Sequence, residues 1–358
     1  MERNERSSDK TYGAYLQIQR ERVARPIKLL TYDMSEKSEV ANVVFLSDVH
    51  YGDRFCEVQK FKRHIEAIAK MDNAVVVLNG DLINNATIDA PPSAYDDILR
   101  PDKTILDMAE MLEPIKDKIA VVASGNHELW SEKKTGIDPT LVLAKALGLE
   151  DKYASEMWVV DVKVKKSPDC KKDKIVIAGR HGSGGGKAAG AAINKVDEMV
   201  SAVKNADIYV VGHLHKPGMS VRDIESIEYI GGKPMAVQHP IYEISCSSYQ
   251  SYNRFAAKHA MKPSSTENRV YQFWNGVNPE AKDIIYQGDI RKPKYKTFCN
   301  TLSFEQFKVR EEDKNLYTEE EVKKMLEIAK QETKKECLES IAGAVGKMST
   351  EQDLGPSR

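Results

Sequence analysis

Residues 42–50 read NVVFLSDVH, and within this stretch the apolar run 43–46 gives way abruptly to the ionisable pair Asp48 and His50. A short, β-branched apolar run of this kind predicts a buried β-strand. Because side chains alternate along a strand, we expect Asp48 and His50 to point to the same side at its end. A carboxylate and an imidazole in that arrangement can bind one metal ion.

The same change from an apolar run to a polar cluster recurs four times. The runs 73–78, 119–123, 174–178 and 207–211 lead into Gly80-Asp81, Gly125-Asn126-His127-Glu128, His181-Gly182 and Gly212-His213-Leu214-His215. Helical patterns over 57–71, 101–113 and 139–148 lie among these runs. The alternation predicts an α/β layered fold whose first sheet is largely parallel. Ligands gather at the carboxyl ends of strands in such sheets, so we expect the five clusters to meet at one site.

The ligand types within these clusters predict which metals bind. Mixed imidazole and carboxylate donors suit manganese, iron or zinc better than magnesium or calcium, which prefer shells of oxygen atoms. The glycines that precede Asp81, Asn126 and His213 allow sharp turns and a close approach of the backbone. We therefore expect tightly turned loops around a transition-metal site.

The order and spacing of the five clusters resembles the signature DxH, GD, GNH[DE], H, GHxH of the calcineurin-like metallophosphoesterases, over roughly residues 43–215. The resemblance implies a metallophosphoesterase-type β-sandwich of mixed sheets flanked by helices, an αββα arrangement. It divides the chain into a polar N-terminal extension (1–40), a metallophosphoesterase domain (41–300) and a C-terminal helical extension (301–358).

The resemblance also implies a role for each ligand. Two divalent metal ions are expected, with manganese favoured over iron or zinc. Asp48, His50 and His215 would hold the first ion, and Asn126, His181 and His213 the second. Asp81 would bridge both ions.

His127 has a separate implied role, as the general acid for the leaving group, while a hydroxide that bridges the metals is the nucleophile. An imidazole suits acid–base work because its pKa lies near the working pH. The predicted function is metal-dependent phosphoester hydrolysis, with a phosphodiesterase favoured and a nuclease included. Two alternatives stay open: a phosphomonoesterase or small-nucleotide hydrolase, and an inactive metal-binding scaffold whose C-terminal helix recruits a partner.

Two residues near the clusters are candidates for substrate binding. Asn84 stands where many relatives carry a charged residue; it can orient a histidine, and a role as a loop cap is equally compatible with its position. Arg180, directly before His181, could bind phosphate oxygens bidentately or be a solvated strand-end charge. The loop containing Pro91 and Pro92 weakly resembles that of the DNA-repair nucleases in this superfamily, which makes nucleic acid a candidate substrate.

Composition limits the remaining choices. Hydrophobic residues make up 41% of the chain, which allows a sizeable core, and the net charge of -1 gives no general attraction to nucleic acid. The five cysteines are scattered and form no CxxC pair, as is typical of a cytoplasmic protein. No stretch is apolar and long enough to predict a membrane partner, and no pattern predicts an oligomeric state.

Overall fold

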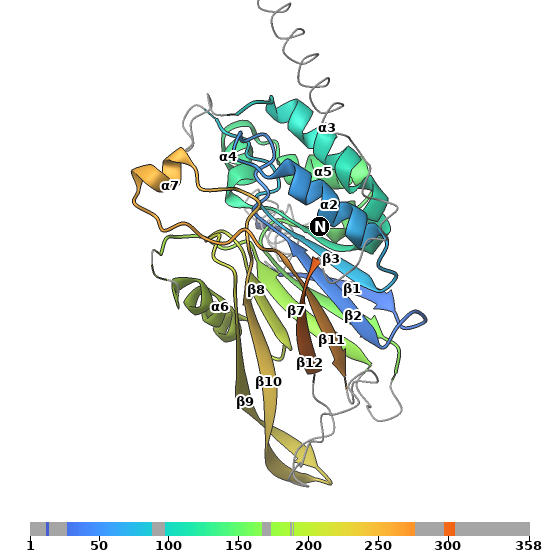
Figure 1. Ribbon diagram of the computed structural model, residues 1–358. Helices are drawn as coiled ribbons and strands as arrows, with labels where there is room; N and C mark the ends of the chain where they lie inside the picture. The colour runs from blue at the N-terminus through green and yellow to red at the C-terminus, as the bar shows by residue number, and fades with distance from the viewer. Residues whose placement is uncertain are drawn as a thin grey trace, which may run out of the picture. The chain divides into compact units, whose positions relative to one another are not determined.

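The computed structural model describes residues 12–13, 27–87, 97–166, 173–186, 188, 190–275 and 297–304. Two six-stranded sheets lie against each other, and helices cover the outer side of each (Figure 1). One set of buried apolar side chains fills the space between the sheets, and two more sets lie beneath the helices. These layers confirm the αββα arrangement that the sequence predicts.

The first sheet contains the three apolar runs that come earliest in the chain. Its strand order is β12 (Thr297–Ser303), β11 (Arg269–Asn275), β2 (Val40–Leu46), β3 (Ala74–Asn79), β4 (Ile119–Ala123), β5 (Tyr153–Ala154). Strands β2 to β5 are parallel, whereas β11 is antiparallel to both of its neighbours. Every residue of β3 and β4 is buried, which explains their continuous rather than alternating apolar patterns.

The second sheet contains the later strands. Its order is β1 (Ile27–Met34), β6 (Met157–Val164), β7 (Lys174–Arg180), β8 (Ile208–Val211), β10 (Lys233–Ser245), β9 (Gly218–Ile230). Strand β8 is parallel to β7 and β10. Strands β9 and β10 form a long antiparallel hairpin that extends away from the helices (Figure 1).

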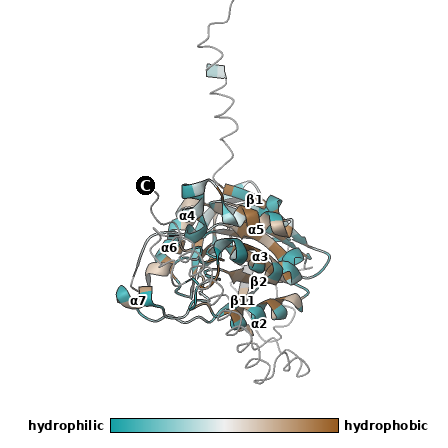
Figure 2. Ribbon diagram, turned by 90° about the horizontal axis from the view of Figure 1, so that it is seen from above, coloured by the Kyte–Doolittle hydropathy of each residue, from teal (hydrophilic) through white to brown (hydrophobic). Residues whose placement is uncertain are grey.

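Four helices each pack an apolar face on a sheet. Helices α2 (Val58–Ala69), α3 (Pro101–Leu112) and α5 (Pro139–Leu147) contribute side chains to the cluster over the first sheet, and α6 (Gly190–Ala202) to the cluster over the second. Seen from above, these helices carry both hydrophilic and hydrophobic residues (Figure 2). In α2 the buried face includes Phe61, Ile65 and Ile68, at the spacing expected of an amphipathic helix.

Several sequence predictions can be compared with these elements. The helices predicted over 57–71, 101–113 and 139–148 match α2, α3 and α5 within two residues. Part of the segment predicted as a polar extension forms β1, which pairs in parallel with β6. The predicted C-terminal helix lies outside the described residues. Nothing tests the domain boundaries, which stay predictions; in the described part, no helix is long and apolar enough to cross a membrane.

Asn79, at the end of β3, ties the two sheets together directly below the polar clusters. Its Oδ1 accepts a hydrogen bond from the indole Nε1 of Trp158 at 3.1 Å, and its Nδ2 donates to the backbone oxygen of Arg180 at 3.1 Å. Asn79 and Trp158 are both fully buried. Water cannot replace these bonds, so the amide fixes the position of β3 against β6 and β7.

We expect Asn79→Ala to lower the free energy of unfolding by about 2–6 kcal/mol, because a buried polar group that loses its partner costs about 1–3 kcal/mol and the substitution affects two. Urea denaturation measures the change. Lys103→Ala, on the exposed side of α3, is the control and should stay within about 0.5 kcal/mol of the parent. An Asn79→Ala variant as stable as this control would contradict the assignment.

Candidate metal centre

The five polar clusters meet, as expected, at the carboxyl ends of β2, β3, β4, β7 and β8. Beyond the strands, the backbones after β2 and β3 stay paired: the Asp48 N–H donates to the oxygen of Gly80, and the His50 N–H to that of Asp81, both at 3.0 Å. The N–H of His213 donates to the Asp48 carboxylate at 3.0 Å. Backbone hydrogen bonds therefore hold the loops in contact with one another.

Five of the predicted ligands have a left-handed backbone that non-glycine residues rarely adopt. Their φ angles lie between 50° and 68°: Asp48, His50, Asp81, His213 and His215. Such conformations are unfavourable and persist where the surrounding structure enforces them, most often at functional sites. Their concentration here marks this end of the sheets as a site rather than an ordinary set of loops.

The expectation that Asp48 and His50 converge because side chains alternate along a strand is wrong. Strand β2 ends at Leu46, so the two residues do not alternate along a strand. Two left-handed residues, separated by Val49, turn both side chains towards the same centre. The expected convergence is found, but turn geometry produces it.

The first predicted ligand set lies together. The Oδ1 of Asp48 is 3.1 Å from the Nε2 of His215, which is 3.0 Å from the Nε2 of His50. One donor atom from each of the three residues falls within 4.8 Å of the others. Asp48 and His50 are buried, whereas His215 is half-buried and lies at the cavity wall.

The second predicted ligand set adjoins the first through Asp81. Its Oδ2 is 3.0 Å from the Nε2 of His181 and 4.0 Å from the Nε2 of His50. The Oδ1 of Asn126 is 3.1 Å from the Nε2 of His181 and 2.6 Å from the Nδ1 of His213. Asp81 thus places one carboxylate oxygen within 4.0 Å of an imidazole nitrogen from each set.

Hydrogen bonds on the far side of the rings fix the histidine tautomers. The Nδ1 of His181 faces the oxygen of Asn79 at 2.8 Å, and the Nε2 of His213 faces the oxygen of Gly184 at 2.8 Å. A carbonyl oxygen only accepts, so each of these nitrogens carries the proton. The other nitrogen of each ring is left to face the centre, as in protein metal sites generally.

Asn84 fixes the tautomers of two other histidines in the same way. Its Nδ2 donates to Asp97, which leaves Oδ1 to accept from the Nδ1 of His50 at 3.2 Å. Its backbone oxygen accepts from the Nδ1 of His127 at 2.6 Å. These contacts fit the interpretation that Asn84 orients a histidine better than the alternative of a loop cap. Asn84 is fully buried, and its predicted contact with substrate stays a prediction.

Arg180, the other candidate for substrate binding, is not brought to the cavity. Its guanidinium forms an ion pair with Glu198 on α6, with Nη2 and Oε2 3.0 Å apart. Arg180 is absent from the described residues that line the cavity. Its predicted role as a phosphate clamp stays a prediction without a contact that supports it.

Glu128 has a structural role that the sequence interpretation missed. Its buried carboxylate accepts hydrogen bonds from the N–H groups of Asp81, Leu82, Ile83 and Gly125, at 2.8–3.2 Å. It therefore clamps the loop after β3 to the start of α4 (Asn126–Thr135). The sequence signal that could have identified Glu128 is the acidic residue that ends the GNH[DE] pattern.

Gly125 explains how closely these two loops approach. A Cβ atom at this position would lie 2.2 Å from both the backbone nitrogen and the Oδ1 of Asp81. Any side chain would therefore displace the central carboxylate. The close approach predicted from the glycines is confirmed here.

The charges of the centre are strongly interdependent. Burial lowers the pKa of His50 well below its usual value and also lowers that of His213, which leaves both rings neutral and able to act as ligands. Burial acts in the same direction on His181, but the carboxylates of Asp81 and Asp48 outweigh it and raise the pKa of His181 to about 10. Without a metal, His181 is therefore the cation that neutralises Asp81.

The donor atoms fit metal ions. With a proton on Nδ1 of His50, its Nε2 presents a lone pair to the Nε2 of His215 only 3.0 Å away. The Nδ1 of His213 likewise presents a lone pair to the amide oxygen of Asn126. Acceptors approach so closely only when a proton or a cation lies between them. Mixed nitrogen and oxygen donors of this kind suit manganese, iron or zinc.

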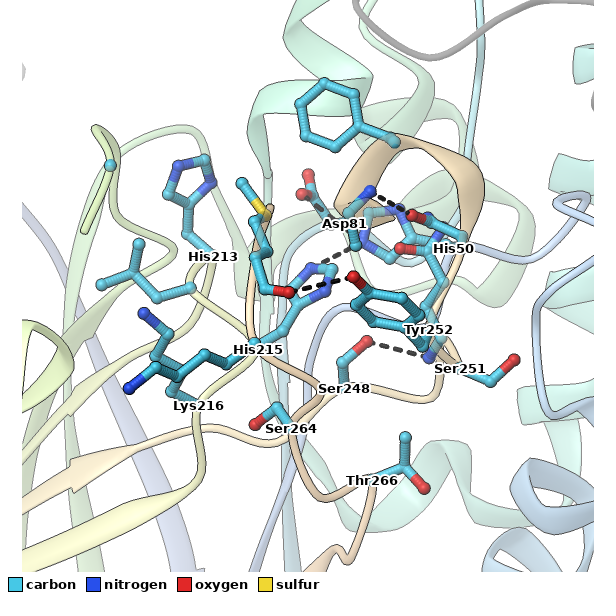
Figure 3. A pocket seen from close by; sticks show the side chains of 18 of the residues that line it. His50, Asp81, His213, His215, Lys216, Ser248, Ser251, Tyr252, Ser264 and Thr266 are labelled. Carbon is cyan, nitrogen blue, oxygen red and sulfur yellow. Dashed lines mark hydrogen bonds and ion pairs between the residues drawn. The ribbon is translucent and has the colours of Figure 1, made fainter. Parts of the chain in front are cut away.

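A cavity of about 480 Å³ opens from this centre. His50, Asp81, Asn126, His127, His213 and His215 line part of it. The rest of its lining comes from Trp130 of α4, the glycine-rich loop 184–186, residues 214–216 and the segment 248–266. Figure 3 shows Tyr252 and Ser248 of that segment beside His215. A ligand at the histidines would therefore have room to extend beyond them.

We expect metal binding to release a proton from His181 and to strengthen with pH. Below the pKa of about 10, His181 carries a proton that a metal ion must displace. For one displaced proton, the apparent affinity for Mn²⁺ should rise about tenfold per pH unit between pH 6 and 8. Calorimetry in buffers with different ionisation enthalpies counts the protons; His181→Asn should release fewer, and an affinity independent of pH would contradict the expectation.

Comparison with known families agrees with this geometry. The sequence model of the calcineurin-like phosphoesterase family matches residues 41–217, which span β2 to the loop after β8 and contain all five clusters. No protein with a curated description matches the sequence. The chain belongs, through residues 41–217, to the calcineurin-like metallophosphoesterases.

Proposed function

We propose that the protein is a phosphodiesterase that works with two divalent metal ions. The observation that carries the proposal is that one carboxylate oxygen of Asp81 lies 4.0 Å from His50 of the first set and 3.0 Å from His181 of the second. Membership of the family makes phosphoester hydrolysis the general reaction. In the proposal, one ion is held by Asp48, His50 and His215, the other by Asn126, His181 and His213, and Asp81 contacts both.

Two ions at this centre would supply a water of lowered pKa and positive charge for the phosphoryl oxygens. We favour Mn²⁺, because three carboxylate or amide oxygens lie among four imidazoles. The protein's own contribution is to keep these seven donors in place. Their positions are fixed by the carboxylate of Glu128 and by the carbonyl oxygens of Asn79, Asn84 and Gly184.

His127 is the proposed general acid. Its Nδ1 is held by the backbone oxygen of Asn84, so Nε2 is the atom able to carry a proton to the substrate. That nitrogen lies 3.9 Å from the Oδ2 of Asp81, and the residue lines the cavity. When the P–O bond to the leaving group breaks and water adds to phosphorus, Nε2–H would protonate the departing oxygen.

The extent of the cavity favours a diester over a monoester. The cavity is lined by residues beyond the histidines, so a second group on the phosphate has room. Of the residues that the structure describes, no arginine lines the cavity, and Arg180 is engaged with Glu198. Nucleic acid is one candidate diester, and a cytoplasmic location stays a prediction.

The reaction class is tested by removing all metal, restoring Mn²⁺ and offering bis-p-nitrophenyl phosphate and p-nitrophenyl phosphate. We expect the diester to be hydrolysed faster, and only in the presence of metal. Hydrolysis of the monoester alone would exclude the diesterase. Bound metal without turnover of either ester would favour the inactive scaffold.

We expect His127→Ala to bind metal normally and to lose about 10²–10⁴-fold in kcat on an unactivated diester such as thymidylyl-thymidine. The loss should be much smaller with p-nitrophenolate as the leaving group, because that group departs without a proton. His239→Ala, on the β9–β10 hairpin, is the control and should match the parent. An equal loss on both substrates would mean that His127 stabilises charge and does not donate a proton.

A further inference from the structure

Beside the histidines, the cavity has a second group of lining side chains. We call this part the outer chamber and define it by six lining residues: Trp130, Lys216, Tyr252, Phe255, Met261 and Lys262. It adjoins the centre directly, because the ring centroid of Trp130 lies 4.1 Å from that of His127. Trp130 belongs to α4, whereas Tyr252, Phe255, Met261 and Lys262 belong to the segment 248–266, which includes α7 (Arg254–Lys258). None of the six belongs to the proposed metal ligands, so another role is needed to explain the chamber.

Large apolar side chains remain accessible within the outer chamber. Tyr252 is 47% exposed and Met261 41% exposed, although both lie beside a buried polar centre. The hydroxyl of Tyr252 donates to the backbone oxygen of Met261 at 3.0 Å, which holds the ring in place across the segment (Figure 3). An aromatic ring that is fixed and still accessible is a ready surface for a planar ligand, because little side-chain freedom is lost on binding.

The chamber also carries positive charge. Lys216 and Lys262 both line the cavity, and Asp81 is the one carboxylate among its described lining residues. The Nζ of Lys216 donates to backbone oxygens of the glycine-rich loop, at Gly186 and Ala188. An anionic group in the cavity would be attracted to both side chains.

We propose that the outer chamber binds a nucleoside and its adjoining phosphate, so that the substrate is a nucleotide-containing diester with its scissile phosphate at Asp81. Aromatic side chains stack with any nucleobase, lysines bind the phosphate, and Ser251 and Ser264 also line the cavity. A phospholipid would bring flexible acyl chains, for which the lysines and serines are poor partners. The inference rests on the proposed function for the position of the scissile phosphate.

The test compares two esters with the same leaving group. Thymidine 5′-(p-nitrophenyl phosphate) and methyl p-nitrophenyl phosphate differ only in the group that the product retains. With the Mn²⁺-loaded protein, we expect kcat/KM to be at least about tenfold higher for the thymidine ester, the order of effect that one base-stacking contact supplies. Tyr252→Ala should reduce this ratio to near one, whereas Tyr252→Phe, which keeps the ring, should retain it.

The contribution of Lys262 is tested with a 3′-phosphate added to the thymidine ester. We expect the added phosphate to raise kcat/KM, and Lys262→Gln to abolish that gain. Lys258→Gln, on α7 and outside the cavity lining, is the matched control and should keep it. A parent protein that gains nothing from the added phosphate would overturn this part of the inference.

A binding measurement separates the inference from the proposed function. Calorimetry compares thymidine 5′-monophosphate with methyl phosphate on the Mn²⁺-loaded parent and on Tyr252→Ala. Tighter binding of the nucleotide without hydrolysis of either ester would remove the proposed function and leave the nucleotide site intact. Hydrolysis of both esters at equal kcat/KM, with equal binding of the two phosphates, would overturn the nucleotide site and leave the hydrolase.

Discussion

The position of the Asp81 carboxylate is the constraint on which the rest of the centre depends. Its Oδ1 accepts from the backbone N–H of His127 at 2.9 Å, and its Oδ2 faces His181 at 3.0 Å. Its own N–H is held by Glu128. One side chain therefore connects the loop after β3 with the start of α4 and the end of β7. If Asp81 moved, both donor sets would lose their common member. A side chain at Gly125 would force such a move, because its Cβ would lie 2.2 Å from the Asp81 carboxylate.

Holding Asp81 in this way is costly for the chain. Five ligand residues adopt a left-handed backbone, and each such conformation costs on the order of 1–3 kcal/mol. Charged groups are buried as well, which requires paired partners. The compensation lies in the fully buried strands β3 and β4 and in hydrogen bonds such as those of Asn79. The sandwich is thus a rigid support whose stability offsets an unfavourable centre, and bound metal would reduce the repulsion among its donors.

Sequence patterns predict the residues of the metal centre better than the contacts that hold those residues in place. Asp48, Asp81, Asn126, His181 and His213 were identifiable because each follows an apolar run, and the ends of parallel strands meet by geometry. The backbone of Asp48 and His50 was not predictable, because a period-two pattern cannot reveal where β2 stops. The role of Glu128 as a clamp, the pairing of β1 with β6 and the bond between Asn79 and Trp158 depend on contacts between residues far apart in the chain. A local pattern can mark such a residue, as GNH[DE] marks Glu128, but it does not show the partners. The outer chamber was not predictable as a unit for the same reason. Tyr252 can be proposed from the sequence as the rim of a pocket, but α4 and the segment 248–266 meet only after the sheets pack.

The segment 248–266 links substrate binding to the metal centre. At its start, the hydroxyl of Ser248 and the N–H of Tyr249 both donate to the backbone oxygen of Asp48, at 2.8 and 3.0 Å. A few residues later the same segment supplies Tyr252 to the outer chamber. A group bound against Tyr252 therefore pushes on a stretch of backbone that is anchored to a metal-ligand loop already held in a left-handed conformation. Because packed backbone of this kind transmits small displacements rather than absorbing them, the part of the substrate that does not react can affect the geometry at the reacting phosphate.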